Sequence, residues 1–437
     1  MRIVVLADSD TRWKWGALLA GQICPDGGAE IRAHLLRGRA TPTERQLAEV
    51  GVAPASIRET TVADFLAEAG EEGPETVGGA DVVILALVGG GAQTLLHGLA
   101  RAWRGRARRP VVVTGYVGVV YEKLTDGLLL RAGADVVLAN SAYDARRFQE
   151  LYGPLGVATG SVVRAALPFL AGRGEQYRPS ESRPFTVVFA AQPSVPEPRA
   201  ARLHLLERCA RHAELHPDRR VLVKLRSRPG EHTTHLEEHP YQRLVARLPR
   251  PLPANCELVY GNMGEVLDDT DLLVTVSSTA ALESLQRGIP TAVLSDAGVR
   301  ESLGNHYFTG SGCVASWDQL DGGLLPTAGR EWLHDQGVLD EKPYEALRSR
   351  VAELHELPAL PPLAPYYTAE NAPAYLPGVL ARYGVAPDGA PLPTAASTAG
   401  RTGTRHAVRR ALAQGARGAY RMGVQHVAPA IRRWGQL

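Results

Sequence analysis

The stretch Asp271–Pro290, which reads DLLVTVSSTAALESLQRGIP, combines residues suited to binding an anion. An apolar strand is predicted to lead into Ser277, Ser278 and Thr279, and a helix is predicted to begin directly after them. This order places three hydroxyls beside the free N–H groups of a helix N-terminus, at the carboxyl edge of a sheet. The stretch therefore predicts a phosphate site, and simple helix capping is the alternative.

Other side chains extend this pattern to a whole nucleotide. Glu283 lies one turn into the same helix, off the spacing of a capping box, and its carboxylate suits a ribose diol. Lys224 and Arg226 end the strand-like VLVKLRS, and two cations there suit a diphosphate or an anionic sugar, with a solvated loop as the alternative. Gln192 ends the strand-like FTVVFAAQ at the same predicted edge, and His235 is a further candidate in the loop after Arg226.

Two aspartates in LADSD follow the first predicted strand. Asp8 or Asp10 could take a proton from a hydroxyl as a general base, and we expect at least one of them to cap the next helix. Gly89, Gly90 and Gly115 lie in glycine-rich segments, VGGGAQ and TGYVG, that are predicted to end strands. Glycines there would let a ligand approach the backbone closely.

The elements that must position these residues form two series of strand–helix alternations, which predict an α/β fold with two Rossmann-like domains. Two polar stretches rich in Pro, Gly, Ala or Thr are predicted to be linkers. The predicted organisation is a first domain at 1–170, a linker at 171–184, a second domain at 185–385, a linker at 386–404 and a tail at 405–437. The last helices of 185–385 are candidates for packing back on the first domain.

The composition excludes several classes of protein. With 437 residues, 45% of them hydrophobic and 22% charged, the chain is neither disordered nor fibrous. Its longest apolar run, within DVVILALVG at Asp81–Gly89, is too short to span a membrane, and without a signal-peptide pattern we expect a cytoplasmic protein. Four scattered cysteines and the lack of GxGxxG, GxxxxGK[ST] and HExxH patterns predict no disulfide framework, no cofactor and no metal.

The tail at 405–437 is basic. From Arg401 to Leu437 there are eight arginines and no acidic residue, and apolar residues recur every three or four positions. This pattern is typical of a helix lying on an anionic membrane surface, with packing on protein or disorder as the alternatives. Tyr420 and Trp434 fall on the apolar stripe rather than among the arginines, so no nucleic-acid partner is expected.

Two resemblances add to this interpretation. The segment TVSSTAALESLQRGIP resembles the Ser-Ser motif of bacterial capsule polysialyltransferases and CDP-glycerol glycerophosphotransferases, in which the serines hold the donor phosphate. Those enzymes have His-Pro at the preceding strand end, where this chain has KLRSRP. The segments FAAQPSVPEPR and NHYFTGSG, among others, resemble an uncharacterised family of glycosyltransferases from high-GC bacteria over roughly Met1–Gly384.

These resemblances imply the GT-B plan of glycosyltransferases, with two Rossmann-like domains facing each other. They imply metal-independent, inverting transfer from a nucleotide-sugar donor to a cell-envelope glycan or lipid-linked acceptor, such as a capsule or teichoic-acid polymer. The base would then come from the first domain, as Asp8 or Asp10. The alternatives are a CDP-polyol-type polyol-phosphate transferase and a non-catalytic protein that binds a sugar nucleotide or polymer. Such an enzyme would work at the inner face of the membrane.

Overall fold

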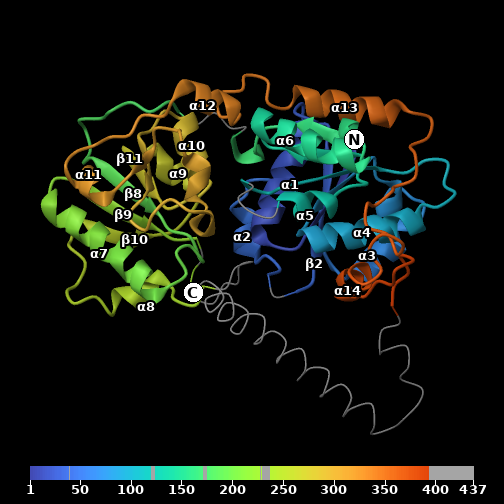
Figure 1. Ribbon diagram of the computed structural model, residues 1–437, viewed down its shortest axis with the longest axis horizontal. Coiled ribbons are helices and arrows are strands. Elements are labelled where there is room, and N and C mark those ends of the chain that lie inside the picture. The colour runs from blue at the N-terminus through green and yellow to red at the C-terminus, as the bar shows by residue number, and fades with distance from the viewer. Residues whose placement is uncertain (39, 120–123, 171–174, 227, 229–236, 393–437) are drawn as a thin grey trace, which may run out of the picture. The chain divides into compact units, whose positions relative to one another are not determined.

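The computed structural model describes residues 1–38, 40–119, 124–170, 175–226, 228 and 237–392. Within them lie two parallel sheets flanked by helices, the predicted α/β fold (Figure 1). His235 and the tail at 405–437 lie outside the described residues, as do 171–174 and 393–404 of the two predicted linkers.

The first sheet has seven parallel strands in the order β3-β2-β1-β4-β5-β6-β7. Its strands are β1 (Arg2–Ala7), β2 (Glu30–Leu36), β3 (Ser56–Thr60), β4 (Val82–Ala86), β5 (Val111–Gly115), β6 (Val136–Ala139) and β7 (Val162–Arg164). The strand order reverses between β1 and β4. A parallel sheet of this kind binds ligands outside the carboxyl ends of its strands at such a reversal.

Helices cover both faces of this sheet. They are α1 (Asp10–Ile23), α2 (Glu44–Ala48), α3 (Val62–Ala69), α4 (Gly89–Ala102), α5 (Leu124–Leu129) and α6 (Ala142–Tyr152). Successive residues of β1 point to opposite faces, so Val4 and Leu6 join one apolar core while Ile3 and Val5 join the other. Burial on both faces explains why these strands read as unbroken apolar runs.

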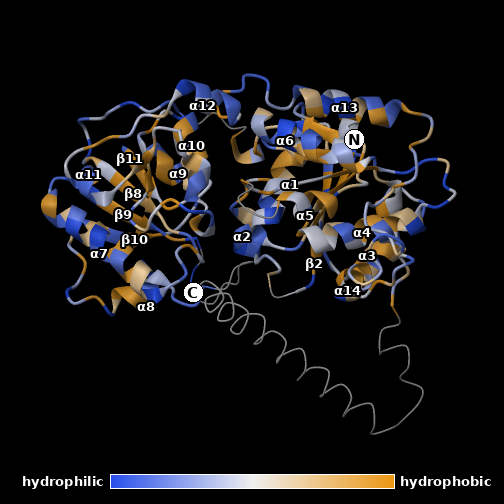
Figure 2. Cartoon of the chain, viewed as in Figure 1, coloured by the Kyte–Doolittle hydropathy of each residue, from blue (hydrophilic) through white to orange (hydrophobic). Residues whose placement is uncertain are grey.

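The second sheet has six parallel strands in the order β10-β9-β8-β11-β12-β13. Its strands are β8 (Thr186–Ala190), β9 (Arg220–Lys224), β10 (Cys256–Val259), β11 (Leu272–Thr275), β12 (Thr291–Leu294) and β13 (Val314–Ala315). Its helices are α7 (Arg199–Leu215), α8 (Tyr241–Val245), α9 (Met263–Asp268), α10 (Ala280–Gln286), α11 (Trp317–Asp321) and α12 (Arg330–Asp335). The hydropathy colouring in Figure 2 shows apolar residues gathered along the strands of both sheets.

Two helices after the second sheet contact the first. Helix α13 (Glu345–Glu356) packs on α1, β5 and β7, where Arg348 Nε donates to the Gln22 carbonyl at 2.7 Å. Helix α14 (Leu376–Ala381) packs on α4 (Figure 1). The chain therefore crosses back after β13.

The observed elements differ from the predicted ones at several points. The VGGGAQ segment does not end a strand, because β4 ends at Ala86 and Gly89 and Gly90 already belong to the first turn of α4. Strand β9 ends at Lys224, so Arg226 lies beyond it. Short elements such as β3 and β13 were not predicted, because an exposed edge strand and a two-residue strand carry little apolar pattern.

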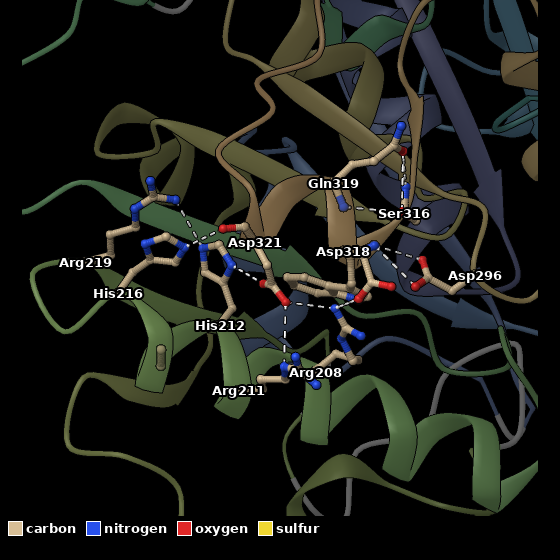
Figure 3. A network of polar contacts seen from close by, with 12 residues as sticks. Arg208, Arg211, His212, His216, Arg219, Asp296, Ser316, Asp318, Gln319 and Asp321 are labelled. Atoms are coloured by element: carbon tan, nitrogen blue, oxygen red, sulfur yellow. Dashed lines mark hydrogen bonds and ion pairs between the residues drawn. The ribbon is translucent and has the colours of Figure 1, made fainter.

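A polar network joins α7 to α11 (Figure 3). The buried His212 ring lies 2.8 Å from Asp321 through Nδ1, and Arg208 Nη2 donates to the other Asp321 oxygen at 2.8 Å. Burial lowers the pKa of His212, while Asp321 opposes that shift. His216 and Arg219 complete the network just before β9 begins, so it lies toward the amino edge of the second sheet. It stabilises the domain away from the strands' carboxyl ends.

Candidate functional site

An ion pair joins the carboxyl edges of the two sheets. Asp10 begins α1 directly after β1, and Arg226 lies two residues beyond β9. Arg226 Nη2 donates to Asp10 Oδ2 at 2.8 Å, and both side chains keep some exposure, 32% for Arg226 and 15% for Asp10. Two residues that the sequence assigned to different roles, a base and a phosphate ligand, therefore meet.

Further contacts surround this pair. Lys14 Nζ, one turn into α1, lies 4.0 Å from Glu283 Oε1 on α10. Burial raises the pKa of Glu283, and Lys14 is the largest influence opposing it. A Cβ atom added to Gly118 would lie 3.5 Å from the Thr279 methyl, so the loop after β5 faces the start of α10. Charges of both signs thus alternate along the facing edges.

Close packing of α1 on the first sheet fixes Asp10. A Cβ atom at Gly16 would lie only 2.5 Å from Val5 Cγ1, so glycine permits this approach. The helix is capped by Ser9, whose side chain makes no capping bond. The prediction that an aspartate caps this helix is therefore wrong.

Asp8 is held within the first domain. Its Oδ1 accepts from Arg12 Nη1 at 2.9 Å, and its Oδ2 accepts from the Val88 N–H at 3.2 Å. Val88 is the residue before α4, so Asp8 ties the end of β1 to the start of α4. Both oxygens have partners, which makes Asp8 a residue that orders this edge.

The three predicted phosphate-binding hydroxyls, those of Ser277, Ser278 and Thr279, differ in their hydrogen bonds and burial. Ser277 is buried, donates from Oγ to the Leu303 carbonyl at 2.6 Å and from its N–H to Gln192 Oε1 at 2.9 Å. Gln192 Nε2 donates in turn to Ser277 Oγ at 3.2 Å. The structure brings the predicted residues Gln192 and Ser277 together, bonded to each other.

The next two hydroxyls are half-buried. Ser278 Oγ accepts from the Ala280 N–H at 3.2 Å, which caps α10. Thr279 makes no side-chain capping bond. Thr279 is the member of the cluster that contacts the opposite edge, at Gly118.

Lys224 ends β9 with its side chain buried. Its Nζ donates to the Leu225 carbonyl at 2.7 Å. Burial lowers the pKa of Lys224 to about 8, opposed by Glu49, while Lys14 and Arg226 lower it further. Repulsion among these cations indicates a place where a bound anion would be stabilised.

Arg202, on α7, organises the loops of the second sheet and was not predicted. It is 1% exposed and stacks on Tyr241, with 4.2 Å between the guanidinium carbon and the ring centre. Its acceptors are the carbonyls of Gln192, Pro193, Pro196 and His239 and the carboxylate of Glu237. The signal in the sequence is its position: it shares a helical face with the buried Leu205, Leu206 and Cys209.

The three glycine candidates are surrounded by protein. A Cβ atom at Gly115 would lie 2.9 Å from Leu138 Cβ, and one at Gly89 would lie 2.8 Å from Leu130 Cδ1. At Gly90 the nearest neighbours are Val379 and Tyr383 of the C-terminal segment. At these glycines the backbone is approached closely by other side chains of the protein, where the sequence predicted close approach by a ligand.

The site thus offers cations beside carboxylates at two facing sheet edges. Among the residues that the structure describes, no group of three or more His, Cys, Asp or Glu side chains is placed to hold a metal ion. Within the same residues, no helix has the length and apolarity to cross a membrane. The arrangement suits binding of an anionic ligand next to a carboxylate that accepts a proton.

Two facing Rossmann-like domains define the GT-B fold, and comparison with solved structures gives several matches. The MnaA–UDP structure of S. aureus matches with a TM-score of 0.50 at 12% identity, over 81% of this chain and 95% of that one. A UDP-N-acetylglucosamine 2-epimerase structure from Listeria monocytogenes has a TM-score of 0.48 at 12% identity, over 80% and 94% of the two chains. Arabidopsis thaliana UGT89C1 complexed with UDP-L-rhamnose has a TM-score of 0.48 at 10% identity, over 81% and 98%.

Family membership makes the class more specific. Residues 3–354 match the family described as "Putative glycosyltransferase (DUF6716)", and the chain belongs to this glycosyltransferase family. No curated protein matches the sequence. The chain is therefore an enzyme of the glycosyltransferase class with a GT-B fold.

Proposed function

We propose that this enzyme transfers a sugar from a nucleotide-activated donor to a hydroxyl of a cell-envelope glycan or lipid-linked acceptor, with inversion and without a metal. The family and the fold support the class, and the structural neighbours include proteins crystallised with UDP or a UDP-sugar. The observation that carries the proposal is the Asp10–Arg226 pair, which places a candidate base beside a candidate phosphate ligand.

The donor would lie along the carboxyl edge of the second sheet. Lys224 and Arg226 would bind its phosphates, together with the hydroxyls of Ser278 and Thr279. Glu283 would accept hydrogen bonds from the ribose. Ser277 and Gln192, bonded to each other, would hold the backbone of this edge in place.

The transfer would be a single displacement. The acceptor oxygen attacks the anomeric carbon, the bond from that carbon to the donor phosphate oxygen breaks, and the acceptor proton moves to Asp10. Negative charge developing on the leaving phosphate is stabilised by Arg226 and Lys224. Arg226 pairs with Asp10, so a bound phosphate would compete for Arg226 and leave Asp10 available to the acceptor.

Thermal unfolding with nucleotides tests the donor site. The probes are CMP, CDP, UMP, UDP, GDP, ADP and NAD. At about 100 times its Kd, a bound nucleotide adds about 2.7 kcal/mol to the free energy of unfolding. We expect one pyrimidine nucleotide to stabilise the wild type, and Arg226→Gln to weaken that effect at least about tenfold in Kd through loss of a charge-assisted bond.

Arg146→Gln is the matched control for this variant. It breaks a 2.7 Å ion pair between α6 and Asp335 on α12, and neither residue is assigned to the donor site. Equal losses of nucleotide affinity in Arg226→Gln and Arg146→Gln would contradict the assignment of Arg226 to the donor site. Stabilisation by NAD alone would contradict the function, and a phosphopolyol rather than a glycoside in the product would identify a polyol-phosphate transferase. Binding without any turnover would favour a non-catalytic binding protein.

The pKa of Lys224 gives the donor affinity a defined pH dependence. A phosphate favours the charged amine, so affinity is constant while Lys224 is protonated, below about pH 8. Above that pH the wild-type Kd is expected to rise by up to about tenfold per pH unit, because a proton must be taken up on binding. The measurement is Kd of the stabilising nucleotide between pH 7 and 9. Lys224→Arg keeps its charge and should show no such rise; parallel curves for both proteins would refute the assignment.

A further inference from the structure

Four tyrosines of the C-terminal segment form a strip on the first domain: Tyr366, Tyr367, Tyr375 and Tyr383. Ring centres lie 5.3 Å apart between Tyr366 and Tyr367, and 5.2 Å apart between Tyr367 and Tyr375. Tyr375 is 42% exposed and the others are half-buried, so the strip faces solvent.

The strip is fixed to α4 and α5. His97 Nε2 on α4 lies 3.0 Å from the Tyr367 carbonyl oxygen, and the Tyr375 hydroxyl donates to Asp126 Oδ1 on α5 at 3.3 Å. Tyr383 packs on the first turn of α4, where a Cβ atom at Gly90 would lie 3.6 Å from its ring. The rings are therefore held in place before any ligand binds.

One end of the strip lies beside Asp8. Val88, which donates its N–H to Asp8, directly precedes the α4 turn on which Tyr383 packs. The Asp8 carboxylate also contributes to raising the pKa of the Tyr383 hydroxyl, after burial. The strip thus begins beside the segment after β1 that carries Asp8 and Asp10.

The strip leads away from Asp8 along α14. Tyr375 precedes this helix and Tyr383 follows it, eight positions later in the chain, which is about 12 Å at the helical rise. That length exceeds one hexose ring. In the part of the chain that the structure describes, the hydroxyls of Tyr366, Tyr367 and Tyr383 make no hydrogen bond, so they can serve a ligand.

We infer that the tyrosine strip binds the acceptor and that the acceptor is an oligosaccharide of several sugar units. Sugar rings present C–H faces that pack on aromatic rings and hydroxyls that bond to phenol oxygens and carboxylates, and tyrosine offers an apolar body with a polar end. Asp126 supplies the carboxylate. The reacting unit would lie at the segment after β1 that carries Asp8 and the proposed base Asp10, and the following units along α14. This inference deepens the proposed function and rests on it.

A glycan array probed with the labelled full chain, without donor, tests the inference. We expect the wild type to retain oligosaccharides in preference to their monosaccharides. Tyr375→Ala should weaken that binding about tenfold, as loss of one aromatic contact predicts, and Tyr375→Phe should keep most of it. Tyr143→Ala is the control, because Tyr143 is a similarly exposed tyrosine, 38%, on α6.

The outcomes separate this inference from the proposed function. No oligosaccharide retained, binding independent of chain length, or equal effects of Tyr375→Ala and Tyr143→Ala would each overturn the inference. Nucleotide stabilisation is measured on the same variants and does not depend on the strip. If a nucleotide stabilises the chain while the array stays empty, the inference fails and the proposed function stands; if neither binds, both fail.

Discussion

Asp10→Asn is expected to lower kcat by about 10²–10⁴-fold, the range in which a general base contributes to catalysis. The substitution keeps the shape of the side chain and removes its ability to take a proton. It also removes the charge that pairs with Arg226, so KM for the donor should stay constant or fall. Steady-state kinetics with the donor identified by thermal unfolding measures both quantities. A fall in kcat without a rise in KM distinguishes loss of the base from loss of structure, which would affect both.

Asp8→Asn is the matched comparison, two residues away on the same loop. An asparagine oxygen can still accept a hydrogen bond from Arg12 or from the Val88 N–H, so kcat should fall only in part and the free energy of unfolding should decrease modestly. If Asp8→Asn abolishes turnover while Asp10→Asn retains it, the base is Asp8 and the assignment to Asp10 is wrong. A fall in donor affinity in Asp10→Asn would contradict the competition for Arg226.

Arg202→Met is expected to lower the free energy of unfolding by about 3–5 kcal/mol, the usual result of removing one partner of a buried ion pair. Methionine replaces much of the volume, but Glu237 loses its cation and four carbonyls lose a donor. Burial already raises the pKa of Glu237, with Arg202 opposing. Urea denaturation of the purified variants measures the difference.

Arg211→Met, on the same helix, provides the control. Arg211 is 60% exposed and lies 3.9 Å from Asp321, so its loss should cost less than about 1 kcal/mol. Arg202→Lys should remain strongly destabilised, because an ammonium has three donors and cannot reach five acceptors. A cost for Arg202→Met as small as that for Arg211→Met would show that the loops do not depend on Arg202.

Much of the fold follows from local pattern. Apolar runs such as RIVVLA and TVVFA read as strands because parallel strands are buried on both faces. The strand–helix junction at Ser277 is likewise local, because strand, hydroxyls and helix are consecutive. The predicted α/β architecture and the glycosyltransferase class are confirmed by the structure and the family match.

The roles of individual side chains were decided by tertiary contacts. Asp10 and Arg226 are 216 residues apart, and no spacing rule indicates that they meet. Ser277 and Ser278 are neighbours of the same type, yet one bonds to a distant glutamine and carbonyl and the other caps its own helix. The pKa of Lys224 depends on its burial and on charges from both domains, among them Glu49 and Arg226. The sequence determines which residue types stand at the strand ends, because hydrophobic periodicity is a local property. Packing in the tertiary structure determines which partners those side chains have, and therefore their charge and their accessibility to a ligand.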